Sequence, residues 1–211
     1  MLRPFERMKL VPDSASEIEV SGRAWRFVQA FVREPLKVGA IWPSSGHLSE
    51  AIVAACHFAP GDTVVELGPG TGNFTKRLLH RLGPDGRLVA LELSETNVNV
   101  LRRRFPRSEI IFDSAEYLGK YVPARSVRCV ISGLAWSNML PAHQSRILNA
   151  LEAALAPGGE FVGFAYKHAR YFPTTICFRR LLRQRFATLE TLPTIWRNLP
   201  PAYVFRCRKL G

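Results

Sequence analysis

The chain has 211 residues, 47% of them apolar, and its 29 Lys and Arg against 17 Asp and Glu give a formal charge of +12. This length and composition favour one α/β domain with at most a small appendage. No apolar run is long enough to predict a membrane-spanning helix, and the N-terminal stretch lacks the apolar core of a signal peptide. The positive charge predicts a polyanionic partner, either nucleic acid or an anionic membrane surface.

The N-terminal part shows two kinds of pattern. Residues 1–20 have no periodicity and are interpreted as a flexible arm. Residues 21–34 have helical spacing, Pro35 interrupts it, and Ser44 or Ser45 can cap a further helix that ends near residue 58. We therefore divide the chain into an arm (1–20), N-terminal helices that act as an interfacial element or lid (21–58), and a main domain (59–211).

The main domain alternates strands and helices. Strands are predicted at 62–67, 86–93, 109–113, 126–132 and 160–166, and helices at 71–82, 94–105, 141–159 and 174–186. Residues 188–196 and 202–209 are predicted to form a closing antiparallel pair. The alternation predicts an α/β fold with a mainly parallel sheet, helices on both faces and ligands at the carboxyl ends of the strands.

The four cysteines are widely separated and match no metal-binding spacing: Cys56, Cys129, Cys177 and Cys207. We expect reduced thiols, a cytosolic protein and no metal.

The strongest motif is VVELGPGTGNF at residues 64–74, in which a strand ends and three glycines alternate before a helix: Gly68, Gly70 and Gly72. Glycine lets a ligand lie against bare backbone, and the helix N-terminus offers unpaired N–H groups. A carboxylate at Glu66 would repel a pyrophosphate, whereas it suits the cationic methionine part of S-adenosylmethionine.

Two further acids end the next strands. Glu92 follows Gly72 by twenty residues, a distance at which a carboxylate can accept hydrogen bonds from ribose hydroxyls. Asp113 ends the third strand and could accept from an adenine amino group. Each acid alone could instead be a helix cap or a solvated strand end, but the set predicts S-adenosylmethionine as cofactor, with S-adenosylhomocysteine as product.

On these motifs, residues 40–207 resemble the class I S-adenosylmethionine-dependent methyltransferases. The resemblance implies a Rossmann-like seven-stranded sheet with an antiparallel last hairpin. It also implies the cofactor-binding residues: Glu66, Gly68, Gly70, Gly72, Glu92, Leu93, Asp113, Ser114 and Ser132.

The segment ISGLAWSNML, residues 131–140, is where such an enzyme would present its acceptor. It lacks the Asn/Asp-Pro-Pro-Tyr element of nucleobase methylators, with Ser132 and Gly133 in its place and Trp136 in the aromatic position. The missing element weakens the interpretation that the methyl acceptor is a nucleobase. It does not exclude that interpretation, because a serine can also accept a hydrogen bond.

A second resemblance rests on residues 33–45, 64–75, 132–139 and 196–208. Together they are similar to the bacterial soluble-type phospholipid N-methyltransferases, although Ala135 replaces the usual proline of the acceptor segment. The resemblance implies stepwise methylation of phosphatidylethanolamine toward phosphatidylcholine by a cytoplasmic enzyme at the inner face of the cell membrane.

Two amphipathic segments fit a lipid surface, because they combine aromatic or aliphatic side chains with cations. The candidate membrane-binding residues are Arg23, Trp25, Arg26, Phe27, Phe31, Arg33, Lys37, Arg179, Arg180 and Arg183.

Repeated methylation of an amine would leave a quaternary ammonium group, and aromatic faces attract such groups. The acceptor-site candidates are therefore Trp42, Ser132, Gly133, Trp136, Tyr166 and Tyr203.

Other functions stay open at this stage. The main enzymatic alternative is an rRNA adenine or small-molecule methyltransferase. An alternative of another class is a non-catalytic S-adenosylmethionine-binding protein at a membrane surface. The expected partners are a phospholipid substrate and an anionic membrane, and no nucleic acid.

Overall fold

The computed structural model describes residues 46–211. Contacts divide the chain between Ala40 and Ile41, so all described residues belong to the second unit. The predicted arm, the helix at 21–34 and Trp42 lie outside the described residues. Helix α2 (Gly46–Ala54) packs Leu48 and Ile52 into the core with the sheet. The division of the chain at residues 20 and 58 stays a prediction.

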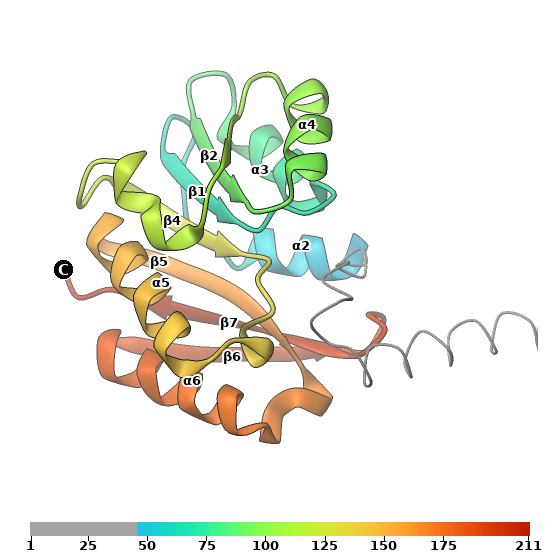
Figure 1. The fold of residues 1–211 in the computed structure, drawn as a ribbon, viewed down its shortest axis with the longest axis vertical. Helices are drawn as coiled ribbons and strands as arrows, with labels where there is room; N and C mark the ends of the chain where they lie inside the picture. The colour runs from blue at the N-terminus through green and yellow to red at the C-terminus, as the bar shows by residue number, and fades with distance from the viewer. Residues whose placement is uncertain (1–45) are drawn as a thin grey trace, which may run out of the picture. The chain divides into compact units, whose positions relative to one another are not determined.

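A single seven-stranded sheet runs through the domain in the order β3-β2-β1-β4-β5-β7-β6 (Figure 1). Its strands are β1 (Thr63–Leu67), β2 (Arg87–Glu92), β3 (Glu109–Phe112), β4 (Val127–Ser132), β5 (Leu155–Tyr166), β6 (Thr188–Ile195) and β7 (Ala202–Arg208). The first five strands pair in parallel, and β7 pairs antiparallel with both β5 and β6. The predicted Rossmann-like sheet with an antiparallel last hairpin is confirmed.

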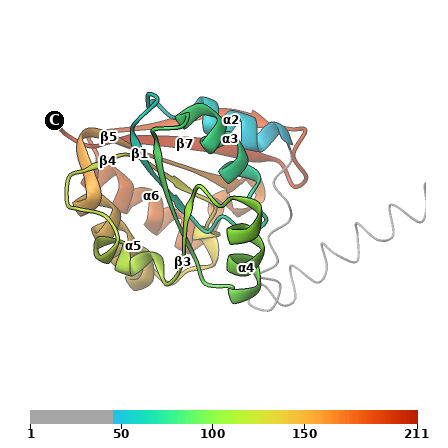
Figure 2. The ribbon, with the colours of Figure 1, turned by 90° about the horizontal axis from the view of Figure 1, so that it is seen from above.

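The helices cover both faces of the sheet, since strands buried on both sides need two apolar layers. They are α3 (Asn73–Leu82), α4 (Glu95–Arg104), α5 (Pro141–Ala154) and α6 (Pro173–Arg185), with 3-10 turns η1 (Ala115–Lys120), η2 (Trp136–Asn138) and η3 (Lys167–Tyr171). Helices α2 and α3 pack on one face, and α5 and α6 on the other (Figure 2). None of the helices within residues 46–211 has the length and apolar content needed to cross a bilayer.

Strand residues alternate between the two apolar layers, as the pleat requires. Val65 of β1 faces the layer of α5 and α6, while Val64 faces the layer of α2 and α3. A third cluster seats α4 against β2 and β3 through Val98 and Leu101. This two-sided burial explains why β1, β2 and β4 read as continuous apolar runs rather than as alternating ones.

Two element boundaries differ clearly from the sequence prediction. Helix α2 ends at Ala54 and not near residue 58. The helix expected at 141–159 ends at Ala154, and β5 begins at Leu155 instead of near residue 160. Leu155 pairs with Val127, and the register then shifts before Glu160 pairs with Cys129. The Pro-Gly-Gly run therefore lies within an irregular strand, where Gly158 takes a positive φ of 67°.

Candidate active site

The carboxyl ends of the parallel strands meet at one edge of the sheet, hereafter the carboxyl edge. Leu67 of β1 pairs with Leu91 of β2 on one side and with Ser132 of β4 on the other. The chain crosses from one side of β1 to the other at this point, which is where open α/β sheets bind ligands. The glycine loop after β1 and the acceptor loop after β4 are therefore neighbours.

The glycine loop has a backbone that only glycine adopts easily. Gly68, Gly70 and Gly72 have φ values of 69°, 55° and 82°. A Cβ on Gly72 would lie 2.5 Å from the Phe105 ring. Gly72 also precedes α3 and provides no side-chain cap for that helix. The loop has the features expected of a cofactor cradle.

Glu92 ties this loop to the end of β2. Its Oε2 accepts a hydrogen bond of 2.9 Å from the Gly70 N–H, and its Oε1 accepts one of 2.9 Å from the Ser94 N–H. A carboxylate has about four acceptor positions. Glu92 thus keeps capacity for the two ribose hydroxyls that the sequence pattern assigns to it.

Glu66 is completely buried beneath the same loop. Its Oε2 accepts a hydrogen bond of 2.7 Å from the Thr75 hydroxyl, while its Oε1 has no partner among the described residues. The pKa of Glu66 is raised to about 8, and burial of the carboxyl is the main cause. The nearby charge of Glu92 also raises this pKa, whereas the hydrogen bonds from Thr75 lower it in part. A buried oxygen without a donor fits a site that a ligand ammonium would complete.

Asp113, the third acid, lies at the same edge of the sheet, and both of its carboxylate oxygens already accept hydrogen bonds. Phe112, the last residue of β3, pairs with Glu92, so Asp113 follows directly beside the ribose position. Asp113 accepts a hydrogen bond of 2.6 Å from the Tyr121 hydroxyl and one of 2.7 Å from the Ser114 N–H. These bonds hold the pKa of the Asp113 carboxyl below its usual range, with the Tyr121 hydroxyl as the main cause. The adenine contact predicted for Asp113 stays a prediction, and Ser114 caps η1.

Two exposed apolar side chains flank Glu92 at this edge. Leu93 was predicted as a cofactor contact and is 65% exposed, and Phe112, which the sequence analysis did not select, is 54% exposed. Exposed apolar side chains beside a carboxylate suit the flat face of a purine. Phe112 could have been recognised because it ends a strand in pairing register with Glu92.

The acceptor loop touches the glycine loop through its backbone. The Gly133 N–H donates to the Leu67 carbonyl at 2.8 Å, and a Cβ on Gly133 would lie 2.4 Å from the Gly68 carbonyl oxygen. Position 133 therefore needs glycine because the two loops approach closely. Ser132 ends β4, and Gly133 follows it directly.

Ser132 and Trp136 organise the loop from within. The Ser132 Oγ is fully buried and accepts 3.2 Å from the Leu134 N–H and 3.0 Å from the Trp136 Nε1–H. The Trp136 ring is 3% exposed and stacks on Phe178 with 4.3 Å between ring centroids. The structure thus makes Trp136 a core residue, in contrast to the open aromatic wall expected from sequence.

The other aromatic candidates are distributed differently. Tyr166 ends β5 at the carboxyl edge, half-buried, and its ring stacks on that of His168 at 5.6 Å. Tyr203 lies in β7 and is 5% exposed. Trp42 is outside the described residues. Of the aromatic acceptor candidates within residues 46–211, Trp136 and Tyr203 are therefore buried and Tyr166 is half-buried.

Gln144 holds the acceptor loop and was not selected from sequence. Its Nε2 lies 2.8 Å from the Trp136 carbonyl, 3.3 Å from that of Met139 and 3.1 Å from that of Thr174. A polar residue on the otherwise apolar face of α5, with Ile147 and Leu148, was the available signal. Gln144 fastens the loop to the start of α6.

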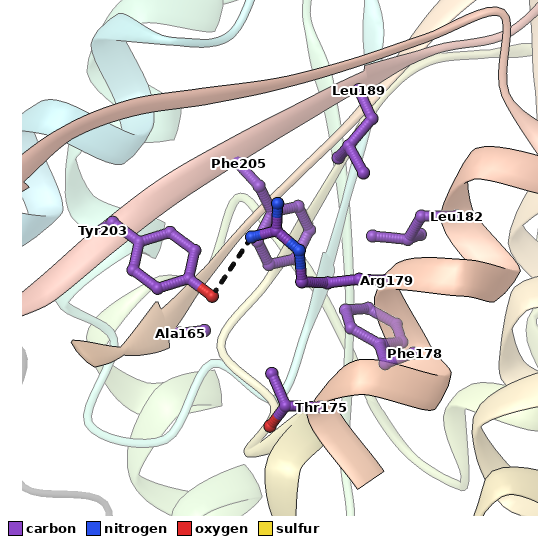
Figure 3. Close-up of a pocket in the computed structure, with 8 residues that line it drawn as sticks. All are labelled: Ala165, Thr175, Phe178, Arg179, Leu182, Leu189, Tyr203 and Phe205. Carbon is purple, nitrogen blue, oxygen red and sulfur yellow. Dashed lines mark hydrogen bonds between the residues drawn. The ribbon is translucent and has the colours of Figure 1, made fainter. Parts of the chain in front are cut away.

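A small cavity between α6 and the last strands unites two sequence candidates (Figure 3). Arg179 extends from α6 toward Tyr203, whose hydroxyl accepts from its Nη1 at 3.5 Å. The surrounding side chains are mainly apolar, including Phe178, Leu182 and Phe205. The cavity has a volume of about 10 Å³, enough for one water molecule. It fixes the Arg179 side chain and is too small for a lipid headgroup.

The remaining membrane-binding candidates divide between the two units. Arg180 and Arg183 are exposed on α6. Arg23, Trp25, Arg26, Phe27, Phe31, Arg33 and Lys37 lie outside the described residues.

Comparison with known proteins agrees with this geometry. Residues 64–159 match the family model of a methyltransferase domain. The chain is 27% identical to the ornithine lipid N-methyltransferase of Singulisphaera acidiphila over 86% of this chain and 94% of that protein. It is 41% identical to the ribosomal RNA small subunit methyltransferase A of Synechococcus elongatus, but over 35% of this chain and 25% of that one.

A solved structure has the same fold. The SAM-dependent O-methyltransferase of Thermotoga maritima superposes with a TM-score of 0.59 and 17% identity, over 77% of this chain and 64% of that one. The chain thus spans nearly the whole of the ornithine lipid enzyme but only part of the other two proteins. Residues 64–159 match a methyltransferase domain, and the fold is that of a solved S-adenosylmethionine-dependent methyltransferase.

Proposed function

We propose that this protein methylates the amine of a membrane phospholipid, phosphatidylethanolamine in the first instance, at the surface of an anionic membrane. S-Adenosylmethionine, when bound, supplies a methyl carbon already activated by its sulfonium. The acceptor nitrogen forms a bond to that carbon while the carbon–sulfur bond breaks, and the nitrogen loses a proton. The phosphatidylcholine end point follows from repeating this step.

The observation that carries the proposal is that the Ser132 hydroxyl already accepts two hydrogen bonds within the acceptor loop. A nucleobase methylator needs an acceptor here for the exocyclic amine of a planar base. Both acceptor positions of the Ser132 hydroxyl are already used by the Leu134 N–H and the Trp136 Nε1–H. A flexible primary amine requires no such in-plane recognition, so this loop suits a lipid headgroup better than a base.

The chain's own residues would contribute alignment and desolvation. Gly133 brings the acceptor loop against the glycine loop, so an amine at the end of β4 lies next to the cofactor cradle. The apolar surroundings lower the pKa of an ammonium and favour its neutral, nucleophilic form. Alignment and exclusion of water are the main requirements of this displacement.

The relatives support a lipid over an RNA acceptor by the extent of the likeness. The ornithine lipid N-methyltransferase aligns over 86% of this chain, whereas the ribosomal RNA methyltransferase aligns over 35%. The shorter alignment with the ribosomal RNA methyltransferase can reflect the cofactor cradle alone, since methyltransferases with unrelated acceptors share that cradle.

A direct assay separates the possibilities. The protein is incubated with methyl-labelled S-adenosylmethionine and, separately, with phosphatidylethanolamine vesicles, ornithine lipid vesicles or purified ribosomal RNA. We expect label in phosphatidylethanolamine, and about tenfold less from the Glu92→Ala variant at a cofactor concentration below saturation. Label in ornithine lipid alone would move the acceptor to another aminolipid, and label in RNA alone would refute the lipid proposal. Cofactor binding without transfer to any acceptor would favour a non-catalytic protein.

A further inference from the structure

An unusual group of apolar side chains is exposed beside the carboxyl end of β5. It comprises Tyr171, Phe172, Ile176, Trp196 and Leu199, which are between 46% and 77% exposed. They come from η3, the first turn of α6 and the loop between β6 and β7. We call them the edge surface. Exposed apolar side chains gathered in this way usually mark an interaction site.

Contacts between the segments make the edge surface continuous. The Lys167 N–H of η3 donates to the Pro201 carbonyl of the β6–β7 loop at 2.8 Å, and the Lys167 Nζ lies 3.9 Å from the centre of the Trp196 ring. Phe172 and Ile176 are one helical turn apart, joined by a backbone hydrogen bond of 3.0 Å. In Figure 1 the β6–β7 loop and the connection from β5 to α6 lie at the same end of the sheet.

Cations surround these side chains. Lys167 and Arg170 lie in η3, Arg180 lies one turn beyond Ile176, and Arg197 follows Trp196. None of the four has a carboxylate of residues 46–211 within ion-pair distance. Residues 161–211 contain ten Lys and Arg and a single acid, Glu190, which pairs with Arg206. Residues 161–211 therefore carry most of the chain's net charge, although Arg206, Arg208 and Lys209 lie toward the opposite edge of the sheet.

The edge surface adjoins the acceptor loop. Thr174, between Phe172 and Ile176, donates its hydroxyl proton to the Ser137 carbonyl of η2. Gln144 links the same residue to Trp136 and Met139. Whatever binds the edge surface is consequently next to the loop that would receive a lipid headgroup.

We propose that the edge surface docks the protein on an anionic lipid bilayer, with Tyr171, Ile176 and Trp196 in the interfacial region and the flanking cations against lipid phosphates. Aromatic and aliphatic side chains with surrounding Lys and Arg are the composition that binds such interfaces. A nucleic acid could use the cations and stack bases on the aromatic rings, but it would leave the aliphatic Ile176 and Leu199 in water. The docking places headgroups at the carboxyl edge, and in that respect the inference rests on the proposed lipid substrate.

The test uses the full chain and vesicles of phosphatidylcholine with or without phosphatidylglycerol. One variant combines Tyr171→Ser, Ile176→Ser and Trp196→Ser. The matched control combines Val100→Ser and Leu210→Ser, which change side chains that are 53% and 72% exposed elsewhere on the domain. We expect the edge variant to float with phosphatidylglycerol vesicles about tenfold less than the wild type, and the control to float normally. Equal flotation of the edge variant and the control would overturn the inference.

A second measurement reports on Trp196 in a background in which Trp25→Phe and Trp42→Phe leave only Trp136 and Trp196. Vesicles with brominated acyl chains should quench a smaller fraction of the tryptophan fluorescence when Trp196→Phe is added to that background, since the remaining Trp136 is buried. Equal quenching would overturn the inference whatever the flotation result, and so would loss of ribosomal RNA binding without loss of flotation in the edge variant.

The proposed function is judged separately. A wild type that docks through the edge surface but transfers no methyl group to lipid would refute the function and leave the surface in place. Lipid methylation together with unchanged flotation of the edge variant would support the proposed function and refute docking through the edge surface.

Discussion

The burial of Glu66 makes a quantitative prediction about stability. The unfolded chain ionises this carboxyl with a pKa of 4.5, whereas burial raises the pKa to about 8 in the folded protein. Between these values the folded state holds a proton that the unfolded state has lost. The free energy of unfolding should therefore fall with rising pH by about 1.4 kcal/mol per pH unit, and level off above the folded pKa.

The Glu66→Gln variant isolates this contribution. The amide keeps the shape of the side chain and can still accept from the Thr75 hydroxyl, but it does not titrate. Urea unfolding of both proteins without cofactor, at about pH 5.5 and about pH 8, cancels the other titrating groups in the difference between the proteins. We expect the variant to gain about 3 kcal/mol relative to the wild type between the two conditions. A difference that does not change with pH would show that Glu66 ionises normally.

Cofactor binding should reverse the effect. A ligand ammonium beside the unpartnered Oε1 stabilises the carboxylate, so binding near neutral pH should release a proton from the wild type and none from the variant. Calorimetry in two buffers with different ionisation enthalpies measures this proton. Equal proton release by the two proteins would place the ammonium elsewhere.

Three further substitutions test the cradle and the acceptor loop. Glu92→Ala should weaken binding of S-adenosylhomocysteine about tenfold or more, because hydrogen bonds to a charged group contribute about 1.5–3 kcal/mol, and unchanged affinity by calorimetry would remove its ribose role. Gly133→Ala places a Cβ 2.4 Å from the Gly68 carbonyl oxygen, so we expect a loss of about 1–3 kcal/mol, and a thermal midpoint equal to that of the wild type would contradict the close approach. Ser132→Ala leaves the buried Trp136 Nε1–H without its acceptor and should cost about 1–3 kcal/mol with a changed near-ultraviolet circular dichroism signal, whereas an unaltered spectrum would mean that the serine does not position the ring.

Much of the fold was predictable from the sequence because its signals are local. Apolar runs such as residues 62–67 and 126–132 can be buried on both faces only in the middle of a sheet. The predicted Ser94 cap is present, since its hydroxyl accepts from the Asn97 N–H at 3.3 Å. The start of β5 was missed because the pairing of Leu155 with Val127 depends on a neighbouring strand and outweighs the local Pro-Gly-Gly signal.

The sequence alone was enough to predict the cofactor cradle, because the spacing of Glu66, three glycines and Glu92 is typical of the strand-and-turn geometry of a ligand-binding edge. It could not determine what each side chain contacts. Only the tertiary structure placed Trp136 against Phe178, buried Glu66 with one oxygen that has no partner among residues 46–211, and joined η3 to the β6–β7 loop through Lys167. Burial, pKa and exposure depend on segments distant along the chain, and no local pattern records which of those segments become neighbours.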